Sequence, residues 1–241
     1  MNNNGKRTSS QEVVDYLLAQ IQSGALRKGS KLPTEHELTE LLGVSRIPIR
    51  EAISALRTVG ILESRQGGST SVTTKCDPAI LGHMLYDYAI LENVDLHQVV
   101  DVRMLLEPEA AKQAALQGSL RQKEEIFKLS QEYKSVTDSY KSSEENDLLI
   151  AEIDQNIHEA IARASHNDFL WMLLVVSGTS FGELNRKNSQ AVDGWGEQKR
   201  LLFSRQHIDI AQAILDGNAT QAKKSMEKHI QSIKYALTAR P

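Results

Sequence analysis

Hydrophobic residues near the N-terminus recur first at helical spacing and then in alternation, within a stretch of about 65 residues. The periodic stretches predict three helices, over 9–24, 34–42 and 46–59. Residues 61–64 and 70–73 follow as two short strands joined by a glycine-containing turn. The order of helix, helix, short turn, helix and two-stranded wing predicts a winged helix-turn-helix domain over residues 9–73.

Capping residues support these boundaries. Ser9 and Ser10 are candidate N-caps of the first helix, and Thr34 is the candidate N-cap of the second. Ser45 is a candidate cap of the third helix, and Gly60 follows that helix as the expected C-terminal glycine. On the second helix, we expect the apolar face to consist of Leu38, Leu41 and Leu42.

The remainder of the chain has helical periodicity almost throughout, interrupted at Asn, Gly and Ser residues. Seven helices are predicted, over 78–91, 95–117, 119–141, 144–165, 167–188, 195–216 and 218–238. They favour an all-α antiparallel bundle over residues 80–239, joined to the first domain by a linker at 74–79. The fold class is therefore mainly α.

Composition excludes several classes of protein. Of the 241 residues, 40% are hydrophobic and 24% are charged, which is ordinary for a globular chain. The single cysteine, Cys76, excludes an internal disulfide and a cysteine-rich zinc finger. The longest apolar run, 169–176, is shorter than the roughly 18 residues of a membrane helix, and no signal peptide is visible. We therefore expect a cytoplasmic protein with no membrane partner.

Charge is distributed unevenly along the chain. Residues 1–75 hold 10 Lys and Arg against 7 Asp and Glu, whereas residues 76–241 hold 18 against 24. A mildly basic first domain on an acidic second domain indicates that only the first one binds a polyanion.

The start of the third helix offers chemistry suited to DNA. In a helix-turn-helix, the N-terminal residues of the second helix of the motif reach base edges in the major groove. Arg46 and Arg50 are four residues apart, on one face, at that position. Arginine there can contact guanine or clamp phosphate, although solvated surface charge is the alternative interpretation. The wing tip, 66–68, can approach the flanking minor groove because glycine lets the backbone come close.

A set of potential metal ligands lies in the helical domain. Asp154 and His158 are one turn apart on one predicted helix, and His207 and His229 lie on the last two helices among apolar residues. If the bundle brings them together, one carboxylate and three imidazoles suit zinc, nickel, manganese or iron. The alternative is that these histidines are core or surface residues with ordinary hydrogen bonds.

Four segments together resemble the GntR family of bacterial transcription regulators. They are LPTEHEL at 32–38, LGVSRIPIREAI at 42–53, GILE at 60–63 and RQG at 65–67. Three positions depart from the family pattern, because His36 replaces a usual arginine, Ser69 a wing glycine and Ser71 an aromatic residue. The DNA-binding residues that we predict are Thr34, Glu35, His36, Ser45, Arg46, Pro48, Arg50, Gln66, Gly67 and Gly68.

The helical domain is similar to the FCD effector domain of the FadR subfamily. The resemblance implies that Asp154, His158, His207 and His229 are metal ligands, with zinc preferred over nickel, manganese or iron. It also implies that Arg103, in an Arg-x-x-x-Glu stretch, clamps an acidic effector, with Asn185 as a weaker pocket candidate. The alternative for Arg103 is a salt bridge to Asp101 or Glu107 on its own helix.

These observations predict a homodimeric transcription regulator that binds a palindromic operator in double-stranded DNA. Between repressor and activator, we expect a repressor. Its effector would be a small carboxylate, such as a hydroxy acid or sugar acid, bound at the metal and acting through the linker. The alternative is a regulator with a structural metal or none, and an apolar or acyl ligand. An enzyme is disfavoured by the attached DNA-binding domain, and a purely architectural DNA-binding protein leaves the large bundle unexplained.

Overall fold

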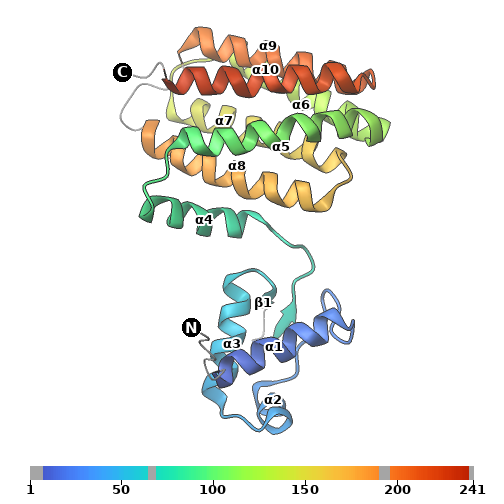
Figure 1. Cartoon of the computed structure of the whole chain (residues 1–241), viewed down its shortest axis with the longest axis vertical. Coiled ribbons are helices and arrows are strands. Elements are labelled where there is room, and N and C mark those ends of the chain that lie inside the picture. The colour runs from blue at the N-terminus through green and yellow to red at the C-terminus, as the bar shows by residue number, and fades with distance from the viewer. Residues whose placement is uncertain (1–7, 65–68, 190–195, 239–241) are drawn as a thin grey trace, which may run out of the picture. The chain divides into compact units, whose positions relative to one another are not determined.

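The computed structural model describes residues 8–64, 69–189 and 196–238, and within them it contains ten helices and two strands (Figure 1). The chain separates into two compact units, residues 1–80 and 81–241. Each unit corresponds to one type of architecture, so each is described by itself.

The first unit is a winged helix-turn-helix, as predicted. Its elements are α1 (Ser9–Gln22), α2 (Glu35–Leu42), α3 (Arg46–Thr58), β1 (Leu62–Ser64) and β2 (Thr70–Val72). The two strands are antiparallel, and Leu62 lies opposite Val72. One apolar core joins helices and wing; its buried members are Val13, Leu17, Leu38, Ile49, Ala52, Leu56, Leu62 and Val72.

Two local expectations for this unit are corrected by the structure. The N-cap of α1 is Thr8, whose hydroxyl accepts a hydrogen bond from the Gln11 backbone N–H, so Ser9 and Ser10 are inside the helix. Leu41 is 60% exposed and does not share the buried face of α2 with Leu38. An eight-residue helix has room for only a narrow buried stripe, and Leu41 lies off it.

The segment before α2 adds to the wing, which the sequence pattern did not indicate. The Gly29 backbone N–H donates to the Val72 carbonyl at 2.9 Å, and the Leu32 N–H donates to the Thr70 carbonyl at 2.9 Å. Lys31 forms an isolated antiparallel bridge with Ser71. These bonds join the segment that leads into α2 to the edge of β2 that does not pair with β1.

The second unit is the predicted helical bundle. Its helices are α4 (Ala79–Leu91), α5 (Leu96–Gln117), α6 (Leu120–Asp138), α7 (Glu144–Ala164), α8 (Asp168–Ser189), α9 (Glu197–Leu215) and α10 (Ala219–Thr238). Helix α5 packs against α7, α8, α9 and α10, while α6 packs against α7 and α9. In Figure 1, α5 accordingly runs through the middle of the bundle. Helix α4 begins at the last residue of the segment predicted as a linker.

Local sequence explains where the bundle helices begin. Asp95 with Gln98, and Ser119 with Gln122, form reciprocal capping boxes at the starts of α5 and α6. Inside α5, Pro108 lacks the N–H that would bond the carbonyl four residues earlier, so the helix has a weakened turn there.

Helix α4 touches α8 at a glycine. The Ser180 hydroxyl of α8 donates to the Gly82 carbonyl at 2.9 Å, and Gly82 is buried. Elsewhere α4 exposes large apolar side chains, namely Leu81, Met84, Leu85, Tyr88 and Leu91. A glycine at the crossing permits close approach of the two backbones.

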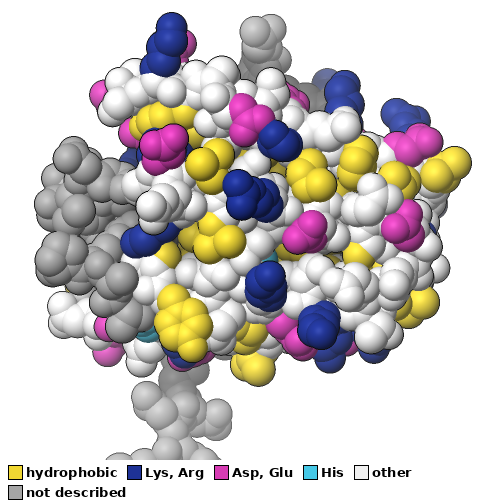
Figure 2. Space-filling view, turned by 90° about the horizontal axis from the view of Figure 1, so that it is seen from above, with side chains coloured by type: hydrophobic (Ala, Val, Ile, Leu, Met, Phe, Trp, Pro, Cys, Tyr) yellow, Lys and Arg dark blue, Asp and Glu magenta, His cyan; other side chains and the backbone are white. Residues whose placement is uncertain are grey.

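On the face of the second unit that Figure 2 shows, acidic and basic side chains are interspersed, with hydrophobic side chains scattered between them. Interspersed charges do not build the one-sided positive field that attracts a polyanion. Among the described residues, none of the helices has the length and apolar character needed to cross a lipid bilayer.

Candidate functional site

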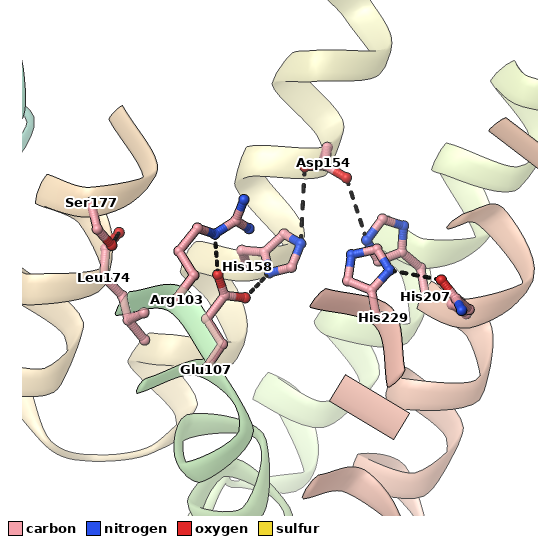
Figure 3. A network of polar contacts seen from close by, with 9 residues as sticks. Arg103, Glu107, Asp154, His158, Leu174, Ser177, His207 and His229 are labelled. Carbon is pink, nitrogen blue, oxygen red and sulfur yellow. Dashed lines mark hydrogen bonds and ion pairs between the residues drawn. The ribbon is translucent and has the colours of Figure 1, made fainter. Parts of the chain in front are cut away.

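The bundle brings the four sequence-predicted metal ligands together (Figure 3). Asp154 and His158 come from successive turns of α7, His207 from α9 and His229 from α10. One possible ligand atom from each residue lies within 4.8 Å of those of the others. The Asp154 carboxylate is 3.4 Å from His207 Nε2 and 3.9 Å from His158 Nε2. Since a zinc–nitrogen bond measures about 2.0–2.1 Å, atoms at this spacing can surround one ion.

His207 and His229 are buried and neutral. His207 and His229 are 0% exposed. Burial lowers the pKa of His207 to about 4, against an opposing effect of Asp154. Burial, followed by the nearby His207, holds the pKa of His229 well below its ordinary value. A neutral imidazole has the free lone pair that a metal requires, so these two rings are in their ligating form at neutral pH.

The chemistry of the donor set fits a metal. Within the part of the chain that the structure describes, the Nε2 atoms of His158, His207 and His229 are all buried without a hydrogen-bond partner. Buried polar atoms are nearly always hydrogen-bonded, so three such atoms that converge beside a carboxylate need an explanation. A divalent transition metal would satisfy all three at once.

Outer contacts orient two of the imidazoles. His229 Nδ1 is 3.2 Å from Gln206 Oε1, and the Gln206 amide donates to the Ser232 hydroxyl at 2.9 Å. His158 Nδ1 contacts the Glu107 carboxylate. With Nδ1 engaged in both rings, Nε2 is the nitrogen left for ligation.

Aromatic rings complete the walls. The Tyr133 ring meets His207 edge-on at a centroid distance of 4.7 Å, and Phe203 meets His229 at 5.6 Å. Burial raises the pKa of Tyr133, so its hydroxyl stays protonated. Sequence reasoning missed these two rings, and also Gln206 as a partner of His229. The sequence held one signal for two of these residues. Phe203 lies one helical turn before His207, and Gln206 is adjacent to His207.

Arg103 is placed beside the ligands but is already paired. It is 4% exposed, its Nε donates to the Glu107 carboxylate, and its guanidinium carbon lies 4.5 Å from the Phe181 ring centroid. The ion pair weighed as the alternative for Arg103 is therefore present, with Glu107. The other alternative partner, Asp101, instead binds Lys234. A role of Arg103 toward an effector remains a prediction.

Two further features describe this side of the site. Burial tends to raise the pKa of Glu107, but Arg103 and His158 outweigh it and hold that pKa at about 2, so the carboxylate is charged. Asn185 lies on α8, four residues beyond Phe181 and on the same helical face, and is half-buried. The role of Asn185 toward an effector also remains a prediction.

In the first unit, the residues predicted at the start of α2 stabilise the helix-turn-helix. Thr34 caps α2, because its hydroxyl accepts a hydrogen bond from the Glu37 backbone N–H at 3.2 Å. In return, the Thr34 backbone N–H donates to the Glu37 carboxylate at 2.7 Å. These bonds to Thr34 lower the pKa of Glu37. Glu35 accepts from Arg50 Nε at 2.8 Å, an ion pair that joins α2 to α3. His36 is exposed and lies 3.6 Å from Glu40.

The start of α3 presents an exposed surface. Ser45 occupies the N-cap position with extended backbone, but its side chain makes no capping bond, contrary to expectation. Arg46 is exposed, and Pro48 is half-buried in the first turn. Ile47, which we had not predicted, is 69% exposed there, and an apolar side chain in that position suits the methyl group of thymine. The wing-tip candidates, Gln66, Gly67 and Gly68, lie outside the described residues.

A winged helix-turn-helix followed by a separate helical domain defines the class of DNA-binding transcription regulators. The chain matches "Bacterial regulatory proteins, gntR family" over residues 9–72 and "FCD domain" over residues 98–232. It therefore belongs to the GntR family of bacterial transcription regulators and carries an FCD domain. Members of this family are transcription regulators, not enzymes, and they bind DNA through the helix-turn-helix domain. FCD domains are known to bind metals.

Several relatives cover nearly the whole chain. The Glc operon transcriptional activator of Escherichia coli (strain K12) is 27% identical, over 96% of this chain and 90% of the relative. The putative L-lactate dehydrogenase operon regulatory protein of Escherichia coli (strain K12) is 29% identical over 94% and 85%. The regulator LutR of Bacillus subtilis (strain 168) is 28% identical over 90% and 96%. Among solved structures, Streptococcus agalactiae GntR matches with a TM-score of 0.65 and 27% identity, over 94% of this chain and 99% of that one.

Proposed function

We propose that this regulator is a metal-dependent sensor of a small carboxylate, and that it acts as a homodimeric repressor on a palindromic operator. The observation that carries the proposal is the cluster of Asp154, His158, His207 and His229, with three buried imidazole Nε2 atoms that lack hydrogen-bond partners. A set of ligands this well oriented by outer contacts is typical of a metal site rather than of an accidental core cluster.

Asp154, His158, His207 and His229 would hold the metal, with zinc as the first choice and nickel, manganese or iron as alternatives. The bound ion would supply a positive centre with positions open to a carboxylate and water. Around it, Tyr133 and Phe203 restrict access of bulk water, and the pair of Arg103 and Glu107 provides a second charged centre on α5.

A small carboxylate suits this environment better than an apolar ligand does. Arg103 is buried, and its guanidinium has more N–H groups than its bond to Glu107 uses. Some relatives are named for operons of small acids, such as the L-lactate dehydrogenase operon. Hydroxy acids are therefore the class of effector to test first.

The two domains would have separate roles. Residues 9–73 would bind one half-site each in a dimer, with contacts from the starts of α2 and α3 and from the wing. Residues 80–239 would bind the effector and form the dimer, and the segment 74–79 would transmit the change. An effector shifts the DNA-binding equilibrium only by its differential affinity for the two arrangements, on the order of 1–3 kcal/mol.

The test is the metal content of tag-free full-length protein, measured by elemental analysis beside Asp154→Ala and His158→Ala. We expect about one transition metal ion per chain in the unaltered protein and a loss of it in both variants. His83→Ala, an exposed histidine on α4, is the matched control and should keep the metal. A protein that carries no metal when purified, and takes up none of the four metals on addition, would refute metal dependence.

A further inference from the structure

Glu107 is a buried carboxylate with a partner on each side. One oxygen receives the Nε–H of Arg103 from the preceding turn of α5, and the other faces Nδ1 of His158 on α7 (Figure 3). It is 4% exposed. We propose that Glu107 is a positioning residue that sets His158 as a metal ligand and links the metal site to Arg103. This inference rests on the proposed metal-dependent function.

The contact with His158 determines which nitrogen can ligate. A carboxylate only accepts hydrogen bonds, so it selects the imidazole tautomer that carries its proton on Nδ1. The lone pair is then on Nε2, which points toward Asp154 at 3.9 Å. A carboxylate on the outer side of an imidazole also fixes the ring orientation and increases its basicity. Glu107 therefore prepares His158 before any metal arrives.

A salt bridge within one helix would not require this arrangement. An exposed i,i+4 pair contributes little, whereas burial of two charges is costly unless every polar atom is satisfied. Here both members are buried, and the second carboxylate oxygen is directed to a residue on another helix. The position of Glu107 is thus explained by His158 as well as by Arg103.

Arg103 adjusts how strongly Glu107 acts on His158. The guanidinium is held by Glu107 on one side and lies over the Phe181 ring of α8 on the other. Because Arg103 and His158 share one carboxylate, any change at Arg103 redistributes the charge that Glu107 offers to His158. An anion bound to the remaining N–H groups of Arg103 would draw the guanidinium away from Glu107 and strengthen its hold on His158. Anion and metal binding would then support each other, and reciprocally.

The first experiment measures the affinity of full-length, metal-stripped protein for Zn²⁺ by competition with a chromophoric chelator. We expect Glu107→Gln to weaken Zn²⁺ binding about 10- to 100-fold, the range found for outer-sphere partners of ligating histidines. Glu109→Gln is the matched control, since Glu109 lies two residues further along α5, is partly exposed and accepts hydrogen bonds from Lys112 and Gln113. It should change the affinity less than about twofold. The visible absorption spectrum of the Co²⁺ form should shift in Glu107→Gln alone, because the ligand geometry changes.

A second variant controls for a loss of stability in Glu107→Gln. Glu107→Gln leaves Arg103 buried without its counter-charge, which alone can be strongly destabilising. The double variant Arg103→Met/Glu107→Gln removes both charges, and we expect it to bind Zn²⁺ as weakly as Glu107→Gln does. Arg103→Met alone should tighten Zn²⁺ binding, because Glu107 then serves only His158. In the double-mutant cycle, the effect of Arg103→Met should therefore vanish when Glu107 is absent.

The outcomes separate the two proposals. If the unaltered protein binds no Zn²⁺, Co²⁺, Ni²⁺ or Mn²⁺, the proposed metal-dependent function is wrong. If it binds Zn²⁺ and both Glu107 variants bind it equally well, Glu107 has no positioning role. An equal effect of Arg103→Met with and without Glu107 would refute the link to Arg103.

Discussion

Substitution of Gly82 by alanine tests the close approach of α4 to α8. A Cβ atom at Gly82 would lie 2.6 Å from Thr179 Cβ and 2.9 Å from the Val176 carbonyl oxygen. Both contacts are far inside van der Waals distance, and both atoms are at or next to the α8 backbone. The two helices must therefore separate, and the hydrogen bond from Ser180 to the Gly82 carbonyl would be lost or stretched.

The expected magnitude follows from two opposing effects. Replacing a helical glycine by alanine stabilises a helix by about 0.5–1 kcal/mol, whereas overpacking a tight contact costs about 1–3 kcal/mol. Gly182→Ala on α8 is the matched control, because a Cβ atom there meets nothing within 4 Å. The gain in helix propensity is common to both variants. The difference in their free energies of unfolding, about 1–3 kcal/mol, therefore isolates the clash.

Differential scanning calorimetry of the full-length protein measures this difference. One kcal/mol corresponds to about 2–4 °C in Tm for a chain of this size, so Gly82→Ala should melt roughly 2–12 °C below Gly182→Ala. Hydrogen exchange should also become faster in α4 of Gly82→Ala than in α4 of the control. If the two variants have the same Tm and the same exchange in α4, the close crossing at Gly82 is wrong.

Two further predictions concern DNA and pH. Arg46→Ala should weaken binding of operator DNA and reduce its salt dependence without changing Tm. Arg57, exposed at the far end of α3, is the control, and Arg57→Ala should leave DNA binding unchanged. Equal DNA affinities of the two variants would contradict the assignment of α3 as the recognition helix. In the metal-free protein, the pKa of buried His207 is about 4, against an ordinary 6.5, so the unfolded chain binds more protons between these values. The free energy of unfolding should therefore fall by roughly 3 kcal/mol as pH is lowered from about 6.5 to about 4. A urea unfolding midpoint that stays constant over this pH range would contradict the prediction.

The helices and their boundaries were predictable because they depend on neighbours in the chain. Apolar spacing of 3.6 residues and capping residues such as Thr34 act within one or two turns. All seven bundle helices were found at nearly their observed bounds for this reason. Among the local predictions that failed, the N-caps at Ser9 and Ser10 were displaced by Thr8. The capping bond from Ser45 and the buried Leu41 depended on side-chain conformation and on the exact width of a buried face.

The four candidate metal ligands were predictable as residue types, and the contacts around them were not. The spacing of Asp154 and His158 places them on one helical face, which is a local property. Their meeting with His207 and His229 depends on how α7, α9 and α10 pack. The two partners of Glu107 show the same division: Arg103 is one turn away in the chain, whereas His158 is 51 residues away and reaches Glu107 only because α5 packs against α7. Periodicity records which face of a helix is buried but not which helix covers it, so these long-range contacts required the folded chain.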